Sequence, residues 1–148
     1  MGCSIGSFTE RLAPSCDNLL AIDIAQAAVD RTRQRLAGTP GVRVERRTFP
    51  DELPEGPFDL VVCSDVLYYM RIQDLPAALR RLATVLRPGG TFMALHYLGD
   101  AGGLSRGDDV HDLLPRVPEG FACVRSERRD GIGPRGAGYR LDRYDRVL

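Results

Sequence analysis

The sequence of 148 residues lacks several features that mark particular classes of protein. All of its 20 basic residues are arginines, which 20 acidic residues balance, and the arginine pairs are scattered along the chain. Nucleic-acid-binding proteins usually cluster their basic residues, so we expect no nucleic-acid partner. No apolar run approaches the roughly 20 residues that span a bilayer. The N-terminus has neither the basic nor the apolar part of a signal peptide. We therefore expect a cytoplasmic protein with no membrane partner.

Histidine and cysteine are too few and too widely spaced to indicate a metal site. The two histidines are His96 and His111, and the four cysteines form no C-x-x-C pair or other zinc-ligand spacing. We expect no bound metal. Cys63 and Cys123 lie in apolar runs, which predicts that both are small core residues.

Short apolar runs alternate with helical patterns through most of the chain. The apolar runs predict strands, and the spacing of apolar residues predicts helices. The expected strands cover 19–24, 42–46, 58–63 and 91–98, the expected helices cover 8–13, 25–36, 75–86 and 108–114, and the segments 121–128 and 139–147 form an antiparallel pair. This order indicates an α/β fold in one domain, residues 1–148, with a mostly parallel sheet.

A glycine turn opens the chain, and an acid follows it at a sequence spacing typical of nucleotide-binding units. Gly2 and Gly6 precede the first helical pattern, and Asp23 ends the next apolar run, 21 residues after Gly2. A carboxylate there can accept hydrogen bonds from both hydroxyls of a ribose. Alone, the glycines fit an ordinary loop, and Asp23 fits an N-cap for the next helix. Together they favour a nucleoside site, which a NAD-dependent dehydrogenase would provide almost as well.

Further motifs decide between these nucleotide-binding folds. Phe58-Asp59-Leu60-Val61-Val62 and Leu86-Arg87-Pro88-Gly89-Gly90 follow the turn and Asp23 in an order and spacing that resemble class I methyltransferases. The blocks Ser64–Tyr69, Val110–Leu114 and Tyr139–Asp142 resemble the nodulation protein S branch. The resemblance implies a Rossmann-like methyltransferase sandwich with S-adenosylmethionine as cofactor and a small-molecule acceptor. It further implies N-methylation of an amino sugar or related amine. An O-methyltransferase of a sugar or secondary metabolite, and a truncated non-catalytic cofactor-binding fragment, are the alternatives.

The resemblance also implies which residues hold the cofactor. The methionine part is expected against the opening turn, the ribose against the first strand, and the adenine against the loop after the second. The residues in these positions are Gly2, Ser4, Gly6, Asp23, Ile24, Thr48 and Phe49, with Ser64 facing the methionine amino group. Thr48 stands where these enzymes often carry an acid for the adenine amine.

The resemblance implies one strand more than the sequence contains. The family carries an apolar strand ending in an acid two positions before the first glycine, whereas here Met1 precedes Gly2 directly. That strand is central in the family's sheet, between the strands that end at Asp23 and Cys63. We expect it to be missing, so that either the start codon is misassigned or the chain is a fragment.

Three residues after strand ends are candidates for catalysis. Asp65 follows the strand that faces the methyl group and fits either an orienting acid or an N-cap for 66–70. Tyr69, like Tyr68, shapes the acceptor pocket or packs in the core. His96 fits a general base, which an acceptor oxygen would need, or a hydrogen-bonded structural histidine. His111 is expected to be structural or pocket-lining. The loop at 99–107 has the glycines of a mobile lid, but also those of simple filler.

Overall fold

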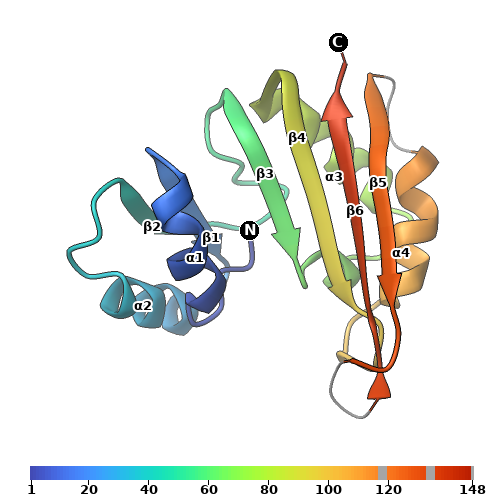
Figure 1. Cartoon of the computed structure of the whole chain (residues 1–148), viewed down its shortest axis with the longest axis horizontal. Coiled ribbons are helices and arrows are strands. Elements are labelled where there is room, and N and C mark those ends of the chain that lie inside the picture. Colours follow the sequence, from blue (N-terminus) through green and yellow to red (C-terminus); the bar gives the residue numbers. More distant parts are fainter. Residues whose placement is uncertain (117–119, 133–135, 148) are drawn as a thin grey trace. The chain divides into compact units, whose positions relative to one another are not determined.

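The computed structural model describes residues 1–116, 120–132 and 136–147, and the chain divides into two compact units. The first unit is Met1–Glu52 and the second is Leu53–Leu148. Figure 1 shows both units. Within the described ranges, no helix combines the length and the apolarity needed to cross a membrane.

The first unit is built on two parallel strands. β1 (Leu19–Asp23) pairs with β2 (Val42–Arg46) in a register that places Asp23 opposite Arg46. α2 (Gln26–Arg35) connects the strands and packs on both of them (Figure 1). α1 (Ser7–Leu12) and the short helix η1 (Ala13–Ser15) precede β1. The apolar stripe predicted for the helix is buried at Val29 and Leu36, which form the core with β1.

The second unit contains a mixed sheet of four strands in the order β3-β4-β6-β5 (Figure 1). β3 (Phe58–Ser64) and β4 (Leu86–Tyr97) are parallel, whereas β6 (Tyr139–Arg146) is antiparallel to both β4 and β5 (Phe121–Arg129). The α/β fold with parallel strands and a C-terminal antiparallel pair is confirmed. The expected absence of the family's central strand stays a prediction; β1 and β3 are edge strands of their own sheets.

Helices cover this sheet through apolar stripes. α3 (Leu75–Val85) packs on β4, and α4 (Gly107–Leu113) packs on β4 and β6. The shorter helices are η2 (Leu67–Tyr69) and η3 (Leu114–Arg116). The predicted stripe with spacing i, i+3, i+4, i+7, i+11 is buried along its whole length at the following positions: Leu75, Ala78, Leu79, Leu82 and Leu86.

Two local expectations were wrong. Arg87–Gly90 was expected to connect a helix to a strand, but β4 already begins at Leu86. The register steps from Phe58 opposite Leu86 to Leu60 opposite Thr91, so the residues between bulge out of the ladder. Cys123 is exposed rather than buried, because β5 is the sheet's edge strand and most of its side chains face solvent.

Candidate functional site

The opening turn and the acid that ends β1 meet at one edge of the first unit. The amides of Gly2 and Cys3 donate to the carbonyl of Ile22 at 3.0 and 3.1 Å. The amide of Ser4 donates to Asp23 Oδ2 at 3.0 Å. The backbone of this turn is left-handed at its glycines, with φ of 73° at Gly2 and 79° at Gly6. The turn therefore wraps the carboxyl end of β1, where ligands of α/β sheets bind.

Gly6 shows why the turn needs glycine. A Cβ atom on Gly6 would lie 2.9 Å from Thr32 Cγ2, inside van der Waals contact, in addition to the strain of its positive φ. Thr32 is fully buried on α2, and its hydroxyl donates to the carbonyl of Ser4 at 3.0 Å. The turn is therefore fixed against α2 rather than free to move as an ordinary loop.

Asp23 keeps acceptor capacity for a ligand. Its Oδ1 accepts the amide of Ala25 at 3.0 Å and its Oδ2 accepts the amide of Ser4. The N-cap residue of α2 is Ala25, so Asp23 precedes the cap position, although it does bind the cap residue's amide. A carboxylate offers about four acceptor sites, so each oxygen can still accept one hydroxyl. The chemistry of this half-buried carboxylate fits the two hydroxyls of a ribose.

The residues predicted to contact adenine lie after the same strand ends. Ile24, directly after Asp23, is 60% exposed, an unusual position for a large apolar side chain. Thr48 and Phe49 follow β2 and are half-buried. Because β1 and β2 are parallel and in register at Asp23 and Arg46, these residues share one edge of the unit.

Glu52 is an acid beside Thr48 that the sequence did not predict. Glu52 Oε2 accepts the amide of Thr48 at 2.7 Å, and the amide of Glu52 donates to the carbonyl of Thr48 at 2.7 Å. The hydrogen bond from the Thr48 amide lowers the pKa of Glu52, so the carboxyl is ionised at neutral pH. A carboxylate thus lies beside Thr48 although no acid occupies that position. The signal in the sequence was the acid pair Asp51-Glu52 in a segment that has no periodicity.

In the second unit, the acceptor turn, defined here as Ser64–Tyr69, follows β3. Asp65 has a φ of +53°, a left-handed conformation that Asp and Asn tolerate better than most residues. Its amide donates to the carbonyl of Leu95 at 2.9 Å. Its Oδ1 accepts both the amide of Tyr97 at 2.8 Å and the hydroxyl of Tyr68 at 3.0 Å.

Asp65 does not cap a helix. The N-cap of η2 is Val66, and no side chain caps that helix. Both hydrogen bonds to the Asp65 carboxylate fall on Oδ1, and from the residues that the structure describes Oδ2 receives none. The backbone thus holds the carboxylate while one oxygen stays available to a ligand.

The two tyrosines of the acceptor turn have different environments. Tyr68 is buried, and burial together with the nearby charge of Asp65 raises the pKa of its hydroxyl, which therefore stays a donor. Tyr69 is 55% exposed, and its ring meets that of Tyr68 edge-on at 4.8 Å between centroids. Tyr68 is thus the core residue of the pair, and Tyr69 presents its ring to solvent.

The glycine-rich loop is tied to the acceptor turn. The amide of Ser105 donates to the carbonyl of Tyr68 at 2.9 Å, and its hydroxyl donates to the carbonyl of Met70 at 3.0 Å. A Cβ on Gly103 would lie 2.6 Å from the Tyr68 carbonyl oxygen. The loop therefore packs closely on the turn through glycine, which goes beyond the role of filler.

His96 is the penultimate residue of β4 and is fully buried, as is His111. The Nε2 of His96 accepts the amide of Leu67 at 3.1 Å, and its Nδ1 lies 3.1 Å from Nε2 of His111. Burial, reinforced by His111, lowers the pKa of His96 to about 3. Both ring nitrogens are engaged inside the protein, an environment that matches the structural alternative for this residue. The described residues hold no cluster of three or more side chains suited to a metal ion.

Comparison with known proteins agrees with this geometry. A family model described as a methyltransferase domain matches residues 1–92. Nodulation protein S of Rhizobium tropici is 38% identical over 91 residues, which are 61% of this chain and 38% of that protein. Nodulation protein S of Bradyrhizobium diazoefficiens is 34% identical over 99 residues, 63% of this chain and 45% of that protein. The chain thus spans less than half the length of these relatives.

A solved structure extends the similarity to the fold. The N-methyltransferase NodS from Bradyrhizobium japonicum WM9, in complex with S-adenosyl-L-homocysteine, has a TM-score of 0.84 and 26% sequence identity. The similarity covers 99% of this chain and 76% of that one. Because the family model matches more than half of the sequence, the chain belongs to the methyltransferase domain family.

Proposed function

We propose that residues 1–148 act as one methyltransferase domain, which binds S-adenosylmethionine and methylates an amine of a small molecule. The observation that carries this proposal is the Ser4–Asp23 contact, since it brings the opening turn and the ribose-binding acid together at the carboxyl end of β1. A NodS structure that contains S-adenosyl-L-homocysteine supports the choice of cofactor.

The proposed cofactor contacts are those that the family resemblance implies for residues at the strand ends. Gly2, Ser4 and Gly6 give the methionine part a backbone surface, and Asp23 accepts the ribose hydroxyls. Ile24 covers one face of the adenine, while Thr48 and Phe49 contact its edge. Glu52 supplies the acceptor for the adenine amine that Thr48 lacks. For Ser64, the last residue of β3, the methionine amino group is the contact that the family resemblance implies.

Methyl transfer requires the protein to align the methyl donor and the acceptor more than to activate either of them. When bound, S-adenosylmethionine supplies a methyl group on a positively charged sulfur, already a good electrophile. Aligning two reactants in this way can contribute about 7–11 kcal/mol to lowering the barrier. Asp65 would hold the acceptor amine through its Oδ2 and take up the proton that the nitrogen loses. The exposed ring of Tyr69 would pack against the acceptor.

The position of His96 favours an amine over a hydroxyl acceptor. A hydroxyl needs a base at the reacting oxygen, and His96 was the candidate for that role. Its ring is fully buried, with one nitrogen bound to the Leu67 amide and the other beside His111. An amine needs only to be deprotonated and aligned, which a carboxylate such as Asp65 can do.

The test is methyl transfer from S-adenosylmethionine carrying a labelled methyl group. Glucosamine oligosaccharides with one free amine serve as acceptors, and the same sugars fully N-acetylated serve as the matched control. We expect label only in the free-amine sugar, and loss of that label in Asp65→Asn. Label in the N-acetylated sugar would indicate O-methylation. No label in either sugar, with S-adenosylhomocysteine still bound, would contradict methyl transfer to amino sugars and support a non-catalytic binding module.

A further inference from the structure

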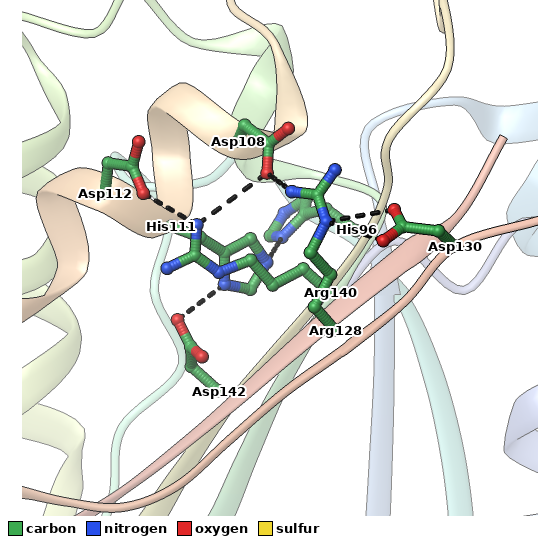
Figure 2. Close-up of polar contacts among 8 residues, drawn as sticks. All are labelled: His96, Asp108, His111, Asp112, Arg128, Asp130, Arg140 and Asp142. Carbon is green, nitrogen blue, oxygen red and sulfur yellow. Dashed lines mark hydrogen bonds and ion pairs between the residues drawn. The ribbon is translucent and has the colours of Figure 1, made fainter.

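Two of the sequence blocks that carry the family resemblance, 110–114 and 139–142, meet inside the second unit. His111 from α4 and Asp142 from β6 lie over the same face of the sheet as His96 from β4 (Figure 2). His111 Nδ1 lies 2.7 Å from Asp142 Oδ2, and His111 Nε2 lies 3.1 Å from His96 Nδ1. The three residues are at most 1% exposed.

The hydrogen bonds run in a single direction. Leu67 N–H donates to His96 Nε2, so that nitrogen carries no proton. Neutral His96 must then carry its proton on Nδ1, which donates to Nε2 of His111. His111 in turn carries its proton on Nδ1, which donates to the Asp142 carboxylate. Every ring nitrogen has a partner, as a buried polar network requires.

Burial and the neighbouring groups stabilise the protonation states that this hydrogen-bond chain requires. Burial, followed by the neighbouring His111, lowers the pKa of His96 to about 3, so its ring is neutral at physiological pH. Burial alone would raise the pKa of Asp142, but the hydrogen bond from His111 contributes to lowering it, so the carboxylate is ionised. A protonated His96 would place Nε2–H against Leu67 N–H, two donors facing each other.

The end of β4 holds the acceptor turn through three consecutive residues. Leu95 accepts the amide of Asp65, His96 accepts the amide of Leu67, and Tyr97 donates to the Asp65 carboxylate. We propose that His96, His111 and Asp142 form a positioning chain, which anchors the Leu67 amide and so fixes the Asp65 carboxylate for the acceptor. This inference rests on the proposed function, but its anchoring step can be measured without catalysis.

A surface cluster holds α4, and with it His111, in place. Arg140 Nη1 lies 2.6 Å from Asp112 Oδ1 and 3.7 Å from Asp108 Oδ1, and Arg128 Nη1 lies 2.5 Å from Asp108 Oδ1 (Figure 2). Gly107 lets α4 begin close to β4, because a Cβ there would lie 2.6 Å from the carbonyl oxygen of Tyr97. These contacts secure a helix of seven residues that is too short to be stable alone.

The first test is nitrogen-15 NMR of the imidazole rings in the wild-type protein. Because the chain has only two histidines, one variant suffices to assign the signals. We expect the proton on Nδ1 in each ring, as the hydrogen bonds require, and the His96 signals to stay constant between about pH 5 and 8. A proton on Nε2 of either ring, or titration of His96 in this range, would overturn the proposed chain.

The second test compares His96→Gln with His96→Asn. The glutamine oxygen reaches the position of Nε2 and can accept the Leu67 amide, whereas the shorter asparagine reaches only the position of Nδ1. We expect the Leu67 amide to exchange about 10- to 100-fold faster in His96→Asn than in His96→Gln, which reflects one unsatisfied buried donor. In the amino-sugar assay, kcat should fall by a similar factor while KM for S-adenosylmethionine changes little.

Val110→Ala is the control for simple loss of stability, since Val110 is a fully buried residue of α4 outside the polar chain. It should destabilise the fold without changing kcat. Equal exchange of the Leu67 amide in the two His96 variants would overturn the proposal, and so would a fall in kcat with Val110→Ala as large as with His96→Asn. If the wild type transfers no methyl group, the exchange comparison still decides the anchoring, and only the proposed function fails.

Discussion

Replacing Asp23 with alanine should weaken binding of S-adenosylhomocysteine strongly. The Asp23 carboxylate is held by the amides of Ser4 and Ala25 and keeps one acceptor site on each oxygen. A hydrogen bond to a charged group contributes about 1.5–3 kcal/mol. Asp23 would accept two such hydrogen bonds from the ribose, and in Asp23→Ala water replaces part of them. We therefore expect a loss of about 3 kcal/mol in binding free energy, or about 150-fold in Kd. Asp23→Asn keeps one acceptor oxygen and should lose about 10-fold.

Isothermal titration calorimetry measures these changes, and circular dichroism confirms that each variant is folded. Asp30→Ala is the matched control, because it also removes one negative charge. Asp30 lies on α2, and its side chain is 61% exposed. Its Kd should stay close to that of the wild type, since exposed charges contribute little. A folded Asp23→Ala protein with wild-type affinity would refute the ribose assignment. An equal loss in Asp30→Ala would show that net charge, not contact, determines binding.

Three further changes test other parts of the structure. Asp65→Asn keeps the shape and the left-handed backbone but not the proton acceptor, so kcat should fall about 100-fold while calorimetry finds unchanged cofactor affinity; an unchanged kcat would remove Asp65 from the mechanism. Gly6→Ala combines a positive φ with a clash at Thr32 and should cost about 1–3 kcal/mol of stability in urea denaturation; a stable variant would contradict the rigid turn. His96 has a pKa of about 3 in the folded protein against 6.5 for an exposed histidine in the unfolded chain, so the folded protein binds fewer protons between these values. The free energy of unfolding should therefore fall by about 1.4 kcal/mol per unit as the pH drops below 6.5, and His96→Gln should lose this contribution.

Periodicity in the sequence predicted most of the fold because the apolar residues repeat with the period of the element they form. The stripe from Leu75 to Leu86 predicted α3 closely, and the late strand pair was placed to within a residue or two at each end. The bulge at Arg87–Gly90 was missed because a Pro-Gly-Gly run is equally typical of a connection between elements. The exposure of Cys123 was missed because the position of a strand within its sheet is a tertiary property.

The candidate site was predictable where a residue's role depends on its place at the end of a strand. Asp23 ends β1 and Asp65 directly follows β3, and the contact of Asp23 with the amide of Ser4 brings the opening turn and this acid together. The partners of His96 were not predictable, because His111 lies 15 residues after His96 and Asp142 lies a further 31 residues along, and they meet only through the packing of α4 on β6. Glu52 was not predicted because it lies in a loop whose sequence has no periodic pattern.

The most direct test of the account is an amide NMR titration of the nitrogen-15-labelled protein with S-adenosylhomocysteine at millimolar concentration. We predict shifts concentrated at Gly2–Gly6, Asp23 and Ile24, with smaller ones at Thr48 and Phe49, and no displacement of the ligand by NAD. An unchanged spectrum, shifts confined to other residues, or competition by NAD at the same amides would contradict an S-adenosylmethionine site at the end of β1.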